Sequence, residues 1–284
     1  MTPSDYDYLR KLLRERSGLV LSADKHYLVE SRLLPISRKN GLSNLSGLVA
    51  KLKSADAEAL NVEVVEAMTT NESLFFRDKL PFEHFRHVVV PALMAARTKA
   101  RRLRIWCAAA STGQEPYSLA MCLREMAAQL ADWRVEIVAT DLCRDVLDRA
   151  SAGTYSQFEV QRGLPIGFLL KYFARDGETW RVAPDIRRMV QFRPLNLLSD
   201  FSHLGMFDVV FCRNVLIYFD QATKSNVLDR IGQVMSHDGY LALGAPETVV
   251  GLTDGFRPVP DRRGLYAPSM SVPKPMLRVI AGGR

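Results

Sequence analysis

The most evident absence in this 284-residue chain is a long hydrophobic run, since no stretch approaches the ~20 apolar residues of a membrane-spanning helix. The polar N-terminus lacks the apolar core of a signal peptide, so we expect a cytoplasmic protein without membrane insertion. The sequence contains no CxxC, HExxH, GxSxG or Walker loop, and its four cysteines and five histidines form no ligand pattern. We therefore expect buried free thiols and no bound metal, and metalloprotease, P-loop and serine-hydrolase chemistry is disfavoured.

The overall composition fits a globular protein, with 48% hydrophobic and 24% charged residues. A chain of this length forms one large domain or two smaller ones. The net charge of +7 fits an acidic partner, but nucleic acid, anionic lipid and an acidic protein surface all satisfy that condition. Charge alone therefore leaves the partner open.

Residues 1–69 carry apolar side chains at helical spacing with turn signals between them, which predicts a small all-helical N-terminal domain. The expected helices run from Ser4 or Asp5 to Arg16, from Ser22 to Lys39 before Asn40-Gly41, and, in shorter pieces starting at Ser43 and Ser46, to Met68. The first 54 residues hold ten Lys and Arg against five Asp and Glu, so the excess in this stretch is basic. A linker and a helix are expected over residues 70–97.

Strands alternate with helices over residues 98–268. The expected strands are Arg104–Ala109, Val135–Thr140, Val190–Arg193, Phe207–Phe211 and Tyr240–Gly244, and the expected helices are Glu115–Ala131, Cys143–Ser151 and Gln221–Met235. Because the strands are continuous apolar runs, they suit a parallel sheet covered on both faces, and the fold class is a doubly wound, Rossmann-like α/β domain. An Asp-Gly pair near Trp180 predicts a small antiparallel β-subdomain at about 170–192. Residues 269–284 are expected to form a disordered tail.

The segment RIWCAAASTGQEPYSLAMCL, residues 104–123, joins a buried strand to an apolar helix through a turn of small residues. In doubly wound folds this arrangement brings the backbone close to a nucleotide-like ligand. Only one glycine is present, Gly113, and the acid Glu115 stands where it would repel a phosphate. The pattern therefore favours a ligand with ribose hydroxyls or a positive charge over a pyrophosphate.

Polar residues follow three further strands, where the carboxyl ends of parallel strands form a ligand crevice. Asp141 can accept both ribose hydroxyl hydrogens there, and it can also cap the helix that follows. Arg213 and Asn214 end a buried run abruptly, which favours a ligand role over a loop that only caps the next helix. Asn196 offers an amide that can read a purine edge, although a lone asparagine is more often a turn residue.

Together these segments resemble the bacterial chemotaxis receptor glutamate methyltransferases of the CheR family. The matching stretches are TTNESLFFR, AAASTGQEPYS, ATD, NLL and FCRNVLIYFD, which occur in the family's order and spacing across nearly the whole chain. The resemblance implies S-adenosylmethionine (SAM) as the cofactor and S-adenosylhomocysteine as its product. It also implies O-methylation of glutamate side chains on the helical cytoplasmic domain of chemoreceptors, in chemotaxis adaptation.

The resemblance assigns the site residues position by position. The implied cofactor-binding residues are Asn71, Ser73, Arg77, Glu115, Asp141, Asn196, Leu197, Arg213 and Asn214. The implied catalytic residues are Arg77, near the reacting sulfur, and Tyr218, beside the transferred methyl group. Taken without the resemblance, the linker residues are better explained as a helix cap beside core aromatics.

The chain departs from the family's pattern in a few places. Ser73 stands where Thr is common, which keeps the hydroxyl, and Gln114 stands where Glu is common, which removes a charge. Pro35 is expected to interrupt the second helix, which bears on receptor docking more than on catalysis. The hairpin DGET is short and lacks the glycine-rich residues of members that bind a receptor's C-terminal pentapeptide, so we expect action independent of that tether.

The implied reaction is an in-line displacement at the sulfonium methyl group. A solvated glutamate has a pKa of about 4.3, so the nucleophile is already ionised at neutral pH and needs no general base. Catalysis is then expected from proximity, alignment and exclusion of water. Two alternatives stay open: a nucleic-acid methyltransferase, although no DPPY- or NPPY-type motif is present, and a non-catalytic SAM-sensing module. A monomer is the expected oligomeric state.

Overall fold

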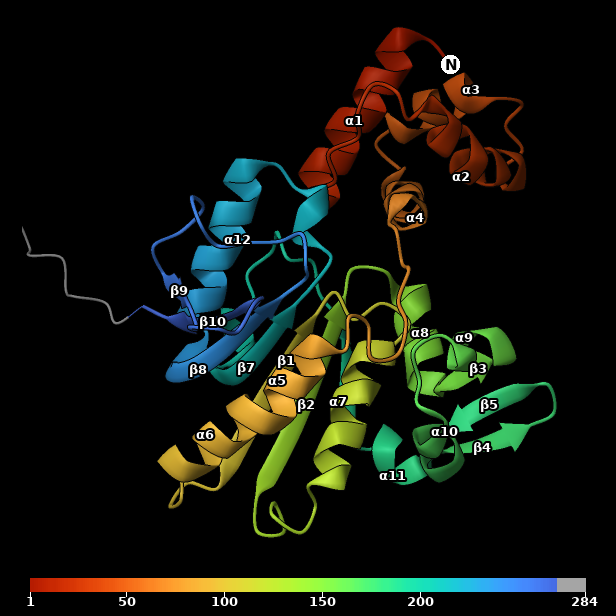
Figure 1. Cartoon of the computed structure of the whole chain (residues 1–284). Helices are drawn as coiled ribbons and strands as arrows, with labels where there is room; N and C mark the ends of the chain where they lie inside the picture. Colours follow the sequence, from red (N-terminus) through yellow and green to blue (C-terminus); the bar gives the residue numbers. More distant parts are fainter. Residues whose placement is uncertain (270–284) are drawn as a thin grey trace, which may run out of the picture.

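The computed structural model describes residues 1–269, so the expected tail lies outside the described residues except for Ser269. Four helices form a bundle apart from the sheet, and a linker leads from α4 into a larger α/β part (Figure 1). This arrangement confirms the predicted fold class. None of the described helices is long and apolar enough to cross a membrane.

The N-terminal bundle consists of α1 (Pro3–Ser17), α2 (His26–Lys39), α3 (Leu45–Leu52) and α4 (Glu58–Met68). Apolar side chains at helical spacing meet in its centre, where Leu9, Leu13 and Leu33 are fully buried. The first helix begins at a capping box made by Thr2 and Asp5, so its N-cap lies two residues before Ser4, the earlier of the two caps expected from the sequence.

Two expectations about α2 are wrong. The helix begins at His26 rather than Ser22, because the Ser22 hydroxyl donates to Asp24 in a local turn. It also continues through Pro35 without a break. The ring removes one backbone donor, but Leu33 and Ile36 on either side are buried in the bundle and hold the helix in place.

The large sheet has the strand order β6-β2-β1-β7-β8-β10-β9. Its parallel strands are β6 (Val190–Pro194), β2 (Arg134–Asp141), β1 (Arg102–Ala108), β7 (Phe207–Cys212) and β8 (Met235–Leu243). The antiparallel strands β10 (Leu265–Pro268) and β9 (Phe256–Pro258) extend one edge and were not predicted. Both are short and lack the long apolar run by which the parallel strands are predicted.

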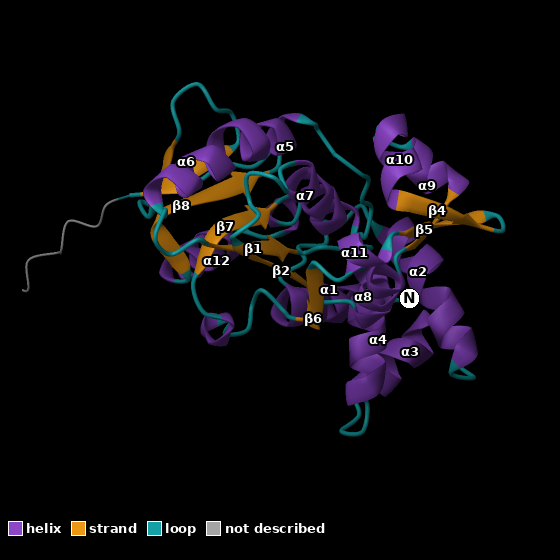
Figure 2. Ribbon diagram, turned by 90° about the horizontal axis from the view of Figure 1, so that it is seen from below, coloured by secondary structure: helices purple, strands orange, loops and turns teal. Residues whose placement is uncertain are grey.

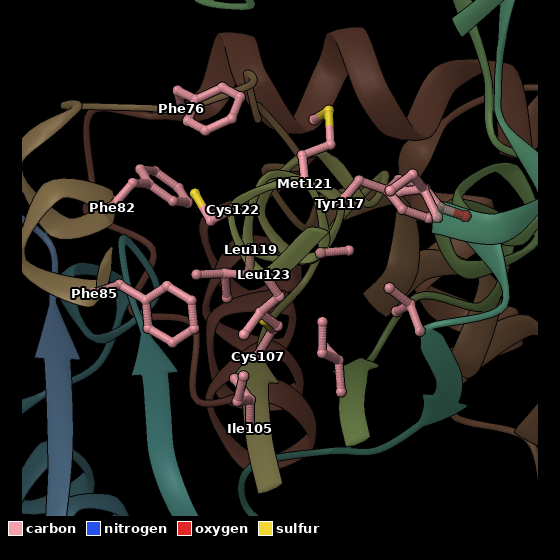
Figure 3. Close-up of a cluster of buried hydrophobic side chains, with 14 of the residues drawn as sticks. Phe76, Phe82, Phe85, Ile105, Cys107, Tyr117, Leu119, Met121, Cys122 and Leu123 are labelled. Atoms are coloured by element: carbon pink, nitrogen blue, oxygen red, sulfur yellow. The ribbon is translucent and has the colours of Figure 1, made fainter. Parts of the chain in front are cut away.

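Helices cover both faces of this sheet. One face packs against α5 (Leu80–His84), α6 (Val90–Ala96) and α7 (Gln114–Glu125), and the other against α12 (Gln221–Gln233) (Figure 2). A π-helical turn, Phe85–Val89, joins α5 to α6 just before Pro91, which cannot donate to a regular helical bond. Figure 3 shows Phe76, Phe82 and Phe85 packed around side chains of α7 and β1.

Several boundaries differ from the sequence expectations. Helix α7 ends at Glu125 instead of Ala131, because Met126 and Leu130 bury their side chains in successive turns that lead back to β2. Helix α12 ends at Gln233, and β8 begins early because Met235 already pairs with Phe207 across a bulge. Helix α8 (Arg144–Ala152) follows β2 as predicted, one residue later than expected.

The small antiparallel sheet is present but larger than predicted. Its strands lie in the order β3-β5-β4, with β4 (Phe173–Asp176) and β5 (Thr179–Val182) forming the expected hairpin. The additional strand β3 (Thr154–Ser156) pairs with β5 from outside the predicted segment. The short helices α9 (Gln157–Gln161), α10 (Ile166–Tyr172) and α11 (Pro184–Arg187) complete this region.

Candidate functional site

A pocket lies where β1, β2, β6 and β7 end, between the α/β part and the end of α1. All ten site residues named from the sequence line it: Asn71, Ser73, Arg77, Glu115, Asp141, Asn196, Leu197, Arg213, Asn214 and Tyr218. The carboxyl ends of neighbouring parallel strands meet at one sheet edge, which is why residues far apart in the sequence converge here. Ser17 and Leu19 add a wall from the N-terminal bundle that the sequence did not predict.

The turn between β1 and α7 is strained and tightly packed. Ala109 and Ser111 both have positive φ angles, 60° and 51°, which non-glycine residues rarely adopt. Gly113 has a φ of 92°, and a Cβ there would lie 2.9 Å from the Cβ of Ala150. Glycine is therefore required at this one position, while the other turn residues are held in place by hydrogen bonds.

The Asp141 carboxylate accepts one of those bonds. Its carboxylate accepts from the Ser111 backbone N–H at 2.8 Å and from the Cys143 N–H at 3.0 Å. Burial raises the pKa of the Asp141 carboxyl, and these backbone donors oppose the shift. The carboxylate thus joins the ends of β1 and β2 and lines the pocket. It does not cap α8, whose N-cap is Cys143 without a side-chain hydrogen bond, so the helix-cap expectation is wrong and the ribose-binding role stays a prediction.

Arg213 is the central charge of the site, with a side chain that is only 1% exposed. It binds the Glu115 carboxylate at 2.6 Å and the Asp78 carboxylate at 2.7 Å, and it donates to the Arg77 carbonyl oxygen at 2.9 Å. Burial raises the pKa of the Glu115 carboxyl, and Arg213 opposes that shift. Because Arg213 follows β7 and its guanidinium binds groups of α7 and the linker, it fixes three walls of the pocket relative to one another.

Asp78 is a residue that the sequence reasoning missed. It directly follows the TTNESLFFR segment and has a φ of 67°, and its neighbours Phe76 and Lys79 both have a φ of 50°. The loop is held by the bond from the Phe76 N–H to the Ser118 hydroxyl at 3.0 Å and by the Arg213 contacts. Non-glycine residues with positive φ cluster at functional sites, and this loop carries Arg77 to the pocket.

Asn196 connects the pocket to the N-terminal bundle. Its side-chain amide donates to the Arg16 carbonyl oxygen at the end of α1, at 2.6 Å, and its side-chain oxygen accepts from the Leu198 N–H at 2.9 Å. One amide hydrogen and one lone pair stay free of these bonds, so the reading of a purine edge stays a prediction. Tyr218 is tied to the same bundle, since its carbonyl oxygen accepts from the Val20 N–H at 2.9 Å.

Two buried polar atoms of the pocket residues have no protein partner: the Arg213 Nε and the Asn214 Oδ1. Buried polar atoms in folded proteins are almost always hydrogen-bonded, so such atoms in a pocket wall mark places for ligand groups. The lining therefore offers one free donor, the Arg213 Nε, one free acceptor, the Asn214 Oδ1, and the carboxylates of Glu115 and Asp141. This set suits a ligand that carries an acceptor group as well as hydroxyl, amino or sulfonium groups. Within residues 1–269, no group of three or more His, Cys, Asp and Glu side chains is placed to hold a metal ion.

Comparison with protein families identifies both parts of the chain. Residues 4–69 match the CheR methyltransferase all-alpha domain, and residues 71–265 match the CheR methyltransferase SAM-binding domain. The chain belongs to the CheR methyltransferase family. The family resemblance drawn from the sequence is therefore confirmed, and SAM is the cofactor of this methyltransferase.

Named proteins also match this chain over most of its length. A chemotaxis protein methyltransferase 1 of Pseudomonas aeruginosa is 44% identical over 260 residues, covering 90% of this chain and 94% of the relative. A chemotaxis protein methyltransferase of Pseudomonas putida is 41% identical, covering 90% and 94%. A chemotaxis protein methyltransferase 1 of Vibrio cholerae is also 41% identical, covering 91% and 95%.

Proposed function

We propose that this CheR-family methyltransferase transfers the methyl group of SAM to glutamate side chains of chemoreceptors and forms glutamate methyl esters. The observation that carries the proposal is the convergence of all ten implied site residues on one pocket. The names of the relatives, which are chemotaxis protein methyltransferases, support the pathway.

The walls of the pocket suggest how the cofactor is held. Asp141, at the end of β2, is placed to accept hydrogen bonds from ribose hydroxyls. Glu115, at the start of α7, and Arg213 and the unpartnered Asn214 Oδ1, just after β7, offer charged and polar contacts. Asn71 and Ser73 approach from the linker, and the Asn71 carbonyl oxygen accepts from the Ser111 hydroxyl at 2.8 Å.

Catalysis requires alignment rather than proton transfer. When bound, SAM supplies the electrophilic methyl group, and a glutamate carboxylate is the nucleophile in its ordinary ionised form. The Arg77 side chain is half-buried in the pocket wall and donates to the Glu72 carbonyl oxygen at 3.2 Å. We assign Arg77 to orienting the incoming carboxylate and Tyr218 to shaping the methyl site, while the surrounding walls exclude water.

The partner that we propose is an acidic, glutamate-bearing helical surface of a chemoreceptor. The ten Lys and Arg against five Asp and Glu in residues 1–54 give helices α1 to α3 the complementary charge, whereas α4 adds Glu58, Glu63 and Glu66. The hairpin β4–β5 turns through a short loop at Gly177 and adds no further glycine-rich segment. We therefore propose action without a receptor pentapeptide tether, and micromolar binding of such a peptide in calorimetry would overturn this part.

Incubation with tritiated SAM tests the proposal. The purified protein is mixed with receptor-containing membranes and, separately, with nucleic acid. Base-labile label on the receptor is expected, because methyl esters hydrolyse in base. Label on nucleic acid would replace the proposal with the nucleic-acid alternative, and no label on either would favour the SAM-sensing module.

Two variants test the catalytic assignments in the same assay. Arg77→Ala and Tyr218→Phe are expected to lower kcat for receptor methylation by about tenfold or more, since alignment is what they supply. Tyr240→Phe, on β8, is the matched control for loss of a phenolic hydroxyl and is expected to keep wild-type turnover. Wild-type turnover in both Arg77→Ala and Tyr218→Phe would remove the assigned roles.

A further inference from the structure

Glu247 is a buried carboxylate outside the pocket lining that no step of the mechanism uses. It lies just after β8, in the segment that follows Gly244. One carboxylate oxygen accepts from the backbone N–H groups of Asn214 at 2.8 Å and Gly244 at 2.7 Å. The other accepts from the N–H groups of Val215 at 3.0 Å and Leu216 at 2.8 Å. A single side chain thus satisfies four backbone donors.

Three of those donors are consecutive and belong to the segment between Arg213 and Tyr218. Asn214 has a φ of 58°, a conformation that asparagine tolerates but that needs support from its surroundings. The carboxylate provides this support, because it binds the N–H of Asn214 itself and of the two residues after it. The position of the Asn214 side chain in the pocket therefore depends on Glu247.

Gly244 shows how closely this contact is packed. A Cβ on residue 244 would lie 2.7 Å from the Glu247 Oε2 and 2.9 Å from the Asn214 Nδ2. Any side chain at this position would displace the carboxylate or the asparagine. The backbone of Gly244 just after β8, the Glu247 carboxylate and the Asn214 side chain therefore form one continuous contact.

The chemistry of the contact requires a carboxylate rather than an amide. All four partners are donors, and an ionised carboxylate has only acceptor sites. A glutamine would direct its NH₂ group toward one pair of N–H groups and leave those donors unsatisfied. Among the described residues, no Lys, Arg or His forms an ion pair with Glu247, and its carboxylate is bound by backbone N–H groups.

We propose that Glu247 is a positioning residue for SAM binding, which acts by fixing the backbone of residues 214–216 and through it Asn214 and the turn that ends at Tyr218. The inference rests on the cofactor-binding role assigned to Asn214 under the proposed function. Its consequence is that cofactor affinity depends on a residue that does not line the pocket.

The test compares two buried carboxylates near opposite ends of β7. Asp208, at the amino end, also accepts from a backbone N–H, that of Arg104 at 2.7 Å, and lies far from the pocket. Glu247→Gln is expected to weaken SAM binding, measured by calorimetry, by about 10- to 100-fold, because two buried donors lose their partner. Both variants are expected to lower the midpoint of thermal unfolding, because each leaves a buried donor without its partner. Asp208→Asn, however, is expected to change SAM affinity by less than about threefold.

Gly244→Ala keeps the carboxylate and displaces it sterically, so it tests the same contact if Glu247→Gln does not fold. It is expected to weaken SAM binding by about tenfold or more. In the double variant with Glu247→Gln, the loss of SAM-binding free energy is expected to be smaller than the sum of the two single losses, because both changes disrupt the same contact. Wild-type SAM affinity in both variants, or an equal loss of affinity in Asp208→Asn, would overturn the proposal. These binding measurements need no receptor, so a failure of receptor methylation by the wild type would count against the proposed function alone.

Discussion

The two ends of β7 bury charge in different ways. At the amino end, the Asp208 carboxylate binds the Arg97 guanidinium, the Arg104 backbone N–H and the Ser236 hydroxyl. At the carboxyl end, Arg213 binds Glu115 and Asp78. Both groups are nearly inaccessible to solvent, and both join several elements of the fold.

What differs is the completeness of the bonding. At the carboxyl end the Arg213 Nε and the Asn214 Oδ1 have no protein partner, and Asn214 has a positive φ. At the amino end Arg97 binds both Asp208 and Asp238, and neither aspartate is among the described side chains with unpartnered buried atoms. The same residue types therefore stabilise the fold at one end, while at the other end the unpartnered atoms belong to residues that line a pocket, which indicates a ligand site.

Arg213→Met is expected to give the largest effect. It leaves the buried Glu115 carboxylate without its cation and releases the linker at Asp78. The free energy of unfolding is expected to fall by about 3 kcal/mol, and SAM affinity by about 100-fold or more. Denaturant unfolding and calorimetry measure the two quantities, and an unchanged SAM affinity would break the comparison.

Arg97→Met is the matched change at the amino end. Removing this cation leaves two carboxylates unpaired, and unfolding free energy is expected to fall by about 3 kcal/mol. The affinity for SAM, measured at a temperature where the variant is folded, is expected to stay within about twofold of the wild-type value. The reason is that the substituted side chain lies at the amino end of β7, away from the pocket. A loss of affinity comparable to that in Arg213→Met would show that the two ends are not separable.

Asp141→Ala tests the other half of the pocket and is expected to have a smaller effect than Arg213→Met. It removes an acceptor of the Ser111 and Cys143 N–H groups and the group assigned to the ribose. We expect SAM affinity to fall by about 10- to 100-fold with little change in kcat at saturating SAM. A large fall in kcat with unchanged affinity would move Asp141 from binding to chemistry.

The smallest expected effect is a difference in the pH dependence of stability. Hydrogen bonding to Arg97 lowers the pKa of Asp238, so the stabilisation it contributes is present above the ordinary value of 3.8 and is lost as the pH falls below it. Burial raises the pKa of Asp141, so stability falls as the pH rises from 3.8 through the folded value. Urea unfolding of the wild type against Asp238→Asn and Asp141→Asn, across acidic pH, should show slopes of opposite sign. Slopes of the same sign would contradict the distinction.

Those parts of the site that depend on strand order and local motifs could be predicted from the sequence. Apolar runs predicted the five parallel strands, and the position after each strand predicted Asp141 and Arg213, because such positions meet at one sheet edge. The family resemblance added the linker residues, for which local pattern alone favours a helix cap.

What the sequence could not predict depends on long-range packing. Asp78 contributes to the site by binding Arg213, which lies 135 residues away in the sequence. Glu247 contributes by binding backbone N–H groups that lie 31 to 33 residues away. Neither residue stands out as a motif. Likewise β3, β9 and β10 are three or four residues long and exist because a partner strand is already in place.

The most direct test of the central claim is to locate the methyl group after the reaction. Chemoreceptor incubated with this protein and SAM is digested and analysed by tandem mass spectrometry, with Arg213→Met as the control for loss of the pocket. We expect methyl esters on receptor glutamates with the wild type and almost none with the variant. Unmodified glutamates with the wild type, or equal methylation by the variant, would contradict the account.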